Sequence, residues 1–291
     1  MELINLLSTS QTWLLVMVGL FSLLIGSFLN VVIYRLPIML ERQWKQDCQE
    51  WQNDAPTEVP TSDFNLVVPR SECPTCGHRI SAWENIPVIS YLFLRGKCAG
   101  CQTPISIQYP LIELATALLS VLVAWKTGYG ATLPALLGFT WVLVALAMID
   151  AKTMLLPDVL TYPLLWAGLL LNMDSLFTSL PNAVLGAVWG YLSLWLVFHL
   201  FRLLTGKEGM GYGDFKLLAA LGAWGGWQIL PFVIFAGSLL GAVFGIAWMI
   251  IKREKHSVPM PFGPWLAIAG FIALIWHAEI LRYMTQMFMP F

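Results

Sequence analysis

Residues 211–216 read Gly-Tyr-Gly-Asp-Phe-Lys, and this stretch places a carboxylate beside two glycines where an apolar segment begins. A comparable placement occurs about sixty residues earlier, where Asp150 follows the apolar run 141–149. An acid at the end of a membrane segment is costly to hold there and usually has a function. The sequence therefore predicts that Asp150 and Asp214 are partners.

The composition around this stretch is that of a membrane protein. The chain has 291 residues, of which 58% are hydrophobic and only 11% are charged, whereas soluble domains carry about a quarter charged residues. We therefore expect an all-α polytopic protein with about eight transmembrane helices in a lipid bilayer. The net charge is −1 and the charges are segregated along the chain, so nothing indicates a nucleic-acid partner.

The apolar segments predict where the chain crosses the membrane. The first runs from Gln11 to Tyr34, long enough for a bilayer core of about 30 Å, and a cleaved signal peptide is disfavoured because the basic flank, Arg35, follows the segment. Seven further spans are expected at 109–126, 131–149, 158–173, 181–204, 214–228, 229–251 and 262–285. The span 214–228 is short and glycines lie near its end, so seven helices in total is the alternative count.

The charges and prolines between the first two spans predict a small inserted domain. We expect a first transmembrane helix in 1–36, a zinc-binding domain in 37–107 and a seven-helix membrane domain in 108–291. A domain of about seventy residues has little core and commonly needs a metal or disulfides to hold it together.

Two Cys-x-x-Cys pairs supply that metal site. Twenty-one residues separate the pairs, a spacing typical of a zinc ribbon, and four thiolates leave no open position for water, so the zinc is expected to be structural. Disulfide or redox use is the alternative. His78 and the unpaired Cys48 are interpreted as bystanders. The predicted ligands are Cys73, Cys76, Cys98 and Cys101.

The basic residues predict the orientation. With the N-terminus outside, the inside segments are 35–108, 150–157, 205–216 and 252–261, and with Arg202 they hold fourteen of the sixteen lysines and arginines. This bias is what the positive-inside rule requires. It places the zinc domain and both aspartates on the cytoplasmic side.

The remaining acids have simpler explanations than Asp150 and Asp214. Asp158 follows Pro157 at a helix start, where the helix dipole favours an anion, and Glu113 could pair with a cytoplasmic base. Asp150 instead ends a helix, where the dipole disfavours it. Two carboxylates brought together share a proton and can perform aspartic-protease chemistry, with one as general base and the other as general acid.

The motifs also carry a resemblance to a known family. Gly-Tyr-Gly-Asp resembles the GxGD signature of intramembrane-type aspartyl proteases, and the wider pattern resembles the bacterial type 4 prepilin peptidases, also called leader peptidase/N-methyltransferases. The matching text is GSFLNVVIYRLP at 26–37, the two cysteine pairs with their flanks at 69–106, YPLIELATA at 109–117, IDAKTMLLPDVLTYPLL at 149–165 and GMGYGDFKLLAALGAWGG at 209–226.

The resemblance implies a function and a location. Such enzymes of the bacterial inner membrane cleave the basic leader of prepilins and type II secretion pseudopilins at the cytoplasmic face, then methylate the new N-terminal residue with S-adenosylmethionine. The N-terminus would be periplasmic, and the oligomeric state is left open.

The resemblance also implies roles for particular residues. The catalytic aspartates fall on Asp150 and Asp214, and the zinc ligands fall on the four cysteines. Residues for methyl transfer are expected between the cysteine pairs, at Glu84, Asn85 and Gly96. The loop along which a substrate approaches is expected to hold Gly211, Gly213 and Lys216.

Two other functions are compatible with parts of the pattern. One is an aspartyl protease without methyl transfer, whose zinc domain only recognises the substrate. The other is a transporter whose membrane acids carry protons or cations. Transporters often show internal repeats and midplane sites, whereas these acids cluster at one membrane face and no repeat is visible.

Overall fold

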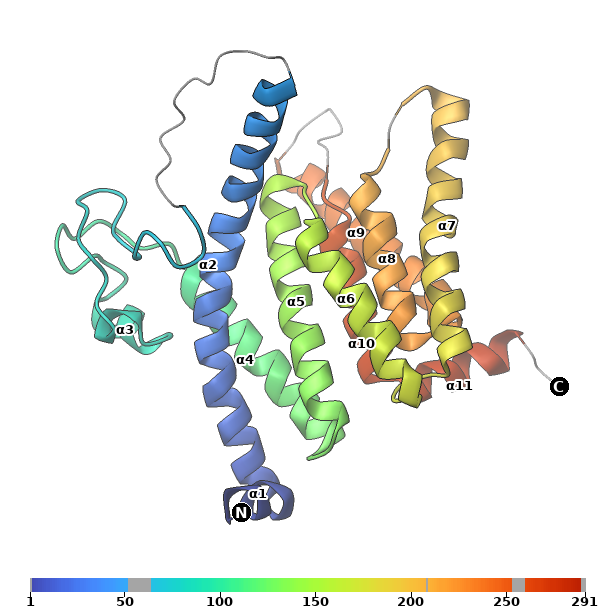
Figure 1. Cartoon of the computed structure of the whole chain (residues 1–291), viewed down its shortest axis with the longest axis horizontal. Coiled ribbons are helices and arrows are strands. Elements are labelled where there is room, and N and C mark those ends of the chain that lie inside the picture. The colour runs from blue at the N-terminus through green and yellow to red at the C-terminus, as the bar shows by residue number, and fades with distance from the viewer. Residues whose placement is uncertain (1, 52–63, 208, 253–259, 289–291) are drawn as a thin grey trace. The chain divides into compact units, whose positions relative to one another are not determined.

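The computed structural model describes residues 2–51, 64–207, 209–252 and 260–288 (Figure 1). Within these ranges the secondary structure is helical, without a named strand, and two isolated β-bridges flank the cysteine pairs. The all-α prediction is confirmed. The α-helices are α1 Glu2–Thr9, α2 Gln11–Trp51, α3 Ile89–Phe93, α4 Gln108–Thr127, α5 Thr132–Thr153, α6 Asp158–Leu171, α7 Leu180–Thr205, α8 Tyr212–Gly225, α9 Leu230–Lys252, α10 Gly263–Ile275 and α11 His277–Phe288.

The chain divides into two compact units, Met1–Trp141 and Val142–Phe291, which we call unit 1 and unit 2. Parts of the loops used to predict the orientation, 52–63, 208 and 253–259, lie outside the described residues. Three short 3₁₀ helices complete the description: η1 Trp83–Asn85, η2 Asn172–Asp174 and η3 Trp227–Ile229.

Five helical segments within the described residues are long and apolar enough to cross a bilayer by themselves. They are α2, α4, α5, α7 and the stretch Trp227–Lys252. Helices α6 and α8 have 14 residues each, so each is about 21 Å long, shorter than a bilayer core of about 30 Å. The membrane-spanning character of the fold is clear, and the total of seven or eight spans stays a prediction.

The last predicted span, 262–285, is wrong as a single helix. The chain breaks between α10 and α11, whose axes differ by 93°. The His277 ring nitrogen Nε2 lies 2.9 Å from the carbonyl oxygen of Gly225, a contact that fixes the chain where it turns. Helix α11 also mixes polar with apolar residues, so a straight continuation would place charged side chains among apolar neighbours.

In unit 1, helices α2 and α4 pack along each other (Figure 1). They approach so closely that a Cβ atom added to Gly26 would lie 2.7 Å from the Cα atom of Glu113. A second link joins them where the Asn30 side-chain amide donates to the carbonyl oxygen of Tyr109 at 3.1 Å.

Helix α2 is longer than predicted. Its 41 residues span about 60 Å, twice the thickness of a bilayer core, and it continues through Pro37 into the stretch assigned to the zinc domain. Beyond Pro37 the residues are mostly polar and exposed, so the extension lacks the apolar character that marked the first half. An apolar run therefore predicts only the first part of this helix.

Unit 2 is built around α8, whose residues from Asp214 to Gly225 are all buried except Lys216. Helices α6, α7 and α10 pack against it. The closest approach is between α7 and α8, where a Cβ atom added to Gly222 would lie 2.2 Å from the carbonyl oxygen of Gly186. Only glycine at both positions permits this contact, and it lets a short apolar helix form the core of the unit.

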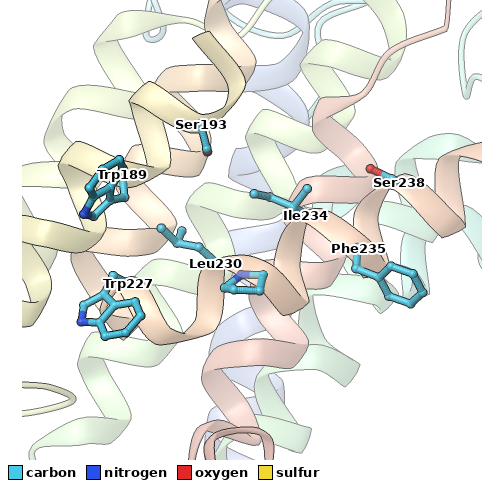
Figure 2. A pocket seen from close by; sticks show the side chains of 8 residues that line it. Trp189, Ser193, Trp227, Leu230, Ile234, Phe235 and Ser238 are labelled. Carbon is cyan, nitrogen blue, oxygen red and sulfur yellow. The ribbon is translucent and has the colours of Figure 1, made fainter. Parts of the chain in front are cut away.

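The outer surface of unit 2 is apolar. A groove of about 550 Å³ lies between α7 and α9, and its lining is mostly apolar, with Trp189, Leu230, Ile234 and Phe235 among its residues (Figure 2). Exposed apolar side chains of this kind are what a lipid-facing surface requires.

Candidate active site and metal centre

Asp150 lies in the last turn of α5 with only 5% of its surface exposed. Its Oδ2 atom accepts a hydrogen bond of 2.9 Å from the backbone N–H of Gly263, the first residue of α10. The first N–H groups of a helix have no partner inside that helix, so this one is free to stabilise a buried carboxylate. A Cβ atom at position 263 would lie 2.7 Å from the same oxygen.

Asp214 lies in the first turn of α8 and is 6% exposed. Its Oδ1 atom is buried and has no hydrogen-bond partner among the described residues. Buried polar atoms are nearly always paired, so an unpaired carboxyl oxygen needs an explanation.

The structure brings Asp150 and Asp214 into one region of unit 2. A Cβ atom at position 263 would meet both the Asp150 carboxylate and Leu156, and Leu156 also lies against Gly213, the residue before Asp214. The side chain of Leu156 packs against glycines from the two helix starts, because Cβ atoms added to Gly213 and Gly263 would lie 2.7 Å and 3.2 Å from it. These glycines allow the loop after α5, the start of α8 and the start of α10 to meet around the acids.

The structure gives each of the three predicted substrate-approach residues a definite position or contact. Gly211 is the N-cap residue of α8 and Gly213 faces Leu156. The Lys216 ammonium donates to both carboxylate oxygens of Asp158, at 2.7 and 2.8 Å. The sequence identifies Asp158 as a residue at the start of a helix. Its ion pair with Lys216 shows that it also joins α6 to α8.

The four predicted metal ligands come together in unit 1. Their sulfur atoms all lie within 4.8 Å of one another, with Cys73 to Cys101 at 3.7 Å and Cys76 to Cys98 at 4.0 Å. Zinc–sulfur bonds of about 2.3 Å in a tetrahedron place the sulfurs about 3.8 Å apart, so the cluster fits a metal ion. The cysteines form no disulfide, and the exposed Cys48 is not part of the cluster.

The local backbone holds each cysteine pair in a tight turn. The N–H of Cys73 donates to the carbonyl of His78, and the N–H of Cys98 donates to that of Thr103, each at 2.9 Å. The Thr103 hydroxyl and backbone lower the pKa of Cys101 to about 6, which favours the thiolate form that binds metal.

The residues expected to serve methyl transfer lie near one cavity of unit 1. Glu84 and Asn85 line this cavity, whose volume is about 570 Å³. Glu84 accepts hydrogen bonds from Ser81, and these together with His78 lower the pKa of Glu84 to about 2. Gly96 adopts a positive φ of 68°, and a Cβ atom there would lie 2.9 Å from the hydroxyl of Tyr91, a residue of the cavity wall.

Sequence reasoning missed Gly263 as a partner of Asp150. The two residues are 113 positions apart, and the interaction uses a backbone N–H that every residue except proline carries. The available signal was the sequence Phe262-Gly263-Pro264, which is typical of a helix start.

Comparisons with known proteins agree with this architecture. Fold and site define a polytopic α-helical membrane protein with two buried acids in one unit and a four-cysteine cluster in the other. Residues 20–127 match the bacterial peptidase A24 N-terminal domain, and residues 137–246 match the type IV leader peptidase family.

Full-length relatives give the same result. The chain is 60% identical over 272 residues to a protein of Aeromonas hydrophila named prepilin leader peptidase/N-methyltransferase, covering 93% of each chain. It is 54% identical to a protein of that name from Pseudomonas aeruginosa over 98% of each chain, and 52% identical to one from Pseudomonas putida over 99% of each. No solved structure matches the chain. The chain belongs to the type IV leader peptidase family.

Proposed function

We propose that this protein is a bifunctional membrane enzyme that removes the leader peptide from prepilins and pseudopilins and then methylates the new N-terminal amine. The observation that carries the peptidase half is the pair of buried carboxyl groups at Asp150 and Asp214, one of them with an unpaired oxygen. The names of the relatives support both halves of the activity.

The peptidase step uses a proton shared between the two carboxyl groups. The ionised member takes a proton from a water molecule, whose oxygen bonds to the carbonyl carbon of the scissile peptide. The protonated member donates to the carbonyl oxygen. The carbon–nitrogen bond then breaks, and the leaving amine takes up the proton that the ionised carboxylate had removed from water. The hydrogen bond from Gly263 stabilises Asp150 in its ionised form, and the titration belongs to the pair as a whole.

The methyl-transfer half has S-adenosylmethionine as its donor. When bound, that molecule would supply a methyl group activated by its positively charged sulfonium sulfur, for transfer to the new N-terminal amine. Glu84 and Asn85 are the candidate residues on the cavity wall, and Gly96 holds the position of Tyr91. The protein's contribution is to bind and orient the two reactants.

The four-cysteine cluster holds a structural zinc ion in this proposal. The donor set of four thiols and the sulfur separations fit zinc. Such an ion would tie together the two turns of a small domain that contains only short helices between residues 64 and 107.

The proposed location is the bacterial inner membrane, with the N-terminus periplasmic and the zinc domain cytoplasmic. Support comes from the distribution of lysines and arginines and from the apolar spans. A prepilin carries a basic leader followed by an apolar helix, so its cleavage site would lie at the inner membrane face, where both aspartates are expected.

The test replaces each acid by its amide. Asp150→Asn and Asp214→Asn should each lower the rate of prepilin cleavage by at least about a hundredfold, because neither reaction role survives without a titratable group. Asp174→Asn, which makes the same chemical change at an exposed position of unit 2, should cleave normally. Normal cleavage by either active-site variant would overturn the peptidase assignment.

A further inference from the structure

We propose that the cavity of unit 1 is the binding site for S-adenosylmethionine and that Glu113 is the residue that holds the positive charge of its sulfonium group. The inference rests on the proposed methyl transfer and adds the place and the recognition chemistry. Its starting point is a charged side chain that the peptidase mechanism does not use.

Glu113 is buried in α4 with 8% of its surface exposed, and it lies on the wall of the cavity. Its Oε2 atom accepts a hydrogen bond of 2.8 Å from the backbone N–H of Val88. Among the described residues no lysine, arginine or histidine forms an ion pair with it. A buried carboxylate without a cationic partner is costly, and a cationic ligand would remove that cost.

Three basic residues line the same wall, and none of them forms an ion pair with Glu113: Arg70 is exposed, His78 pairs with Glu84, and Arg35 is buried. Arg35 is 7% exposed, and its guanidinium donates to the backbone carbonyls of Asn65 at 2.9 Å and Pro69 at 2.7 Å. Arg35 therefore shapes the cavity by fixing the loop that follows residue 63. The carboxylate of Glu113 stays available to a ligand.

The backbone beside Glu113 is held in an unusual conformation. Val88 has a φ of 60°, a left-handed value that is rare for a β-branched residue. Such strain persists where the surroundings fix it, and it concentrates at binding and catalytic sites. Here the hydrogen bond from the Val88 N–H to Glu113 holds the Val88 backbone in this conformation, and the same bond fixes the position of the carboxylate on the cavity wall.

The size and chemistry of the cavity fit the donor. A volume of about 570 Å³ falls in the range of about 300–1,000 Å³ that is usual for small-molecule sites. Aromatic rings suit both the adenine ring and a cation, and they come from four parts of unit 1: α2, the loop at residue 64, α3 and α4. The wall residues that carry them are Tyr34, Phe64, Tyr91 and Tyr109.

The experiment measures equilibrium binding of two ligands to the purified full-length protein without a prepilin. S-adenosylmethionine carries the sulfonium charge, whereas S-adenosylhomocysteine has a neutral thioether and shares the rest of the molecule. Glu113→Gln should raise the Kd for S-adenosylmethionine at least about tenfold and that for S-adenosylhomocysteine less than about threefold. Glu41→Gln, at an exposed position of α2, should change neither.

The amide keeps an acceptor oxygen for the N–H of Val88, so the variant is expected to fold. Hydrogen–deuterium exchange of the wild-type protein gives a second readout that needs no variant. Adding S-adenosylmethionine should slow exchange around residues 84–91 and 108–113.

Distinct results separate the two proposals. Equal Kd values for the wild type and Glu113→Gln, equal weakening for both ligands, or protection confined to unit 2 would overturn the assignment of this site while leaving methyl transfer in place. A wild-type protein that neither binds nor uses S-adenosylmethionine would contradict the methyl-transfer function itself.

Discussion

Gly263 controls the environment of Asp150 more directly than any other described residue. Its N–H donates a hydrogen bond of 2.9 Å to the Asp150 carboxylate, and its missing side chain leaves room for that carboxylate. A hydrogen bond to a charged group contributes about 1.5–3 kcal/mol to stability. Substituting Gly263 therefore disturbs the acid without removing it.

Gly263→Ala should reduce prepilin cleavage at least about tenfold, because its Cβ atom would displace the Asp150 carboxylate and geometry errors of about 1 Å are costly in catalysis. Cleavage is measured on the purified protein at matched concentration. The control is Gly138→Ala, where an added Cβ meets no atom within 4 Å. Equal cleavage by the two variants would contradict the role given to Gly263.

Asp158 should behave as a positioning residue, unlike the paired acids. Asp158→Asn weakens a half-exposed ion pair with Lys216, a contact worth about 0.2–1 kcal/mol, so cleavage should fall less than about tenfold. Lys216→Met should give a similar loss, and the double variant should lose little more than either alone. A loss as large as that of Asp214→Asn would instead place Asp158 in the reaction.

At the scale of single residues, the sequence predicts which acids are unusual. A carboxylate beside an apolar segment is energetically costly, and the neighbouring residues alone reveal that position. Asp150 and Asp214 stand at the ends of apolar segments, and the structure buries both. The contact from Gly263 and the ion pair between Asp158 and Lys216 join residues far apart in the chain. No local pattern encodes the distance between two such residues, so those contacts could not be predicted.

Among the elements, the two cysteine turns of unit 1 are expected to depend on the proposed zinc ion. Cys98→Ser should lower the zinc content well below one ion per chain and expose residues 64–107 to proteolysis, because two turns linked only by hydrogen bonds lack a core. Metal analysis and limited proteolysis measure these effects. Cys48→Ser, which removes an exposed thiol outside the cluster, should retain the metal. Wild-type protein without zinc would refute the structural role.

Helices α7 and α8 depend on their glycine contact. Gly222→Ala places a Cβ atom 2.2 Å from a backbone oxygen of α7, so the helices must separate, at a cost of about 1–3 kcal/mol in the free energy of unfolding. Thermal unfolding in detergent measures the loss. Gly138→Ala is again the matched control, and an unchanged transition temperature for Gly222→Ala would argue against this packing.

Hydropathy predicted the positions of most helices, since apolar runs need no long-range information. Hydropathy did not predict the helix ends where a helix continues into polar residues, or where a long-range contact interrupts an apolar run. The extension of α2 beyond Pro37 is polar, and the bend between α10 and α11 coincides with the contact from His277 to Gly225. The 14-residue length of α8 also makes sense only once its neighbours in unit 2 are known.

At the scale of the whole molecule, we propose that the two reactions take place in different units. The paired acids belong to unit 2, whereas the metal cluster and the cavity with Glu113 belong to unit 1. The order of the reactions requires that leader removal exposes the amine before methylation. Variants of one unit should therefore leave the other unit's chemistry intact when it is given its own substrate.

The most direct test of the paired-acid claim is a single assay that scores both reactions. Purified wild-type protein, Asp214→Asn and Asp174→Asn are each incubated with labelled S-adenosylmethionine and either intact prepilin or a pilin with its leader already removed. We expect that Asp214→Asn leaves prepilin uncut and unmethylated but still methylates the pre-cut pilin, while Asp174→Asn performs both reactions. Cleavage of prepilin by Asp214→Asn at the wild-type rate would contradict it.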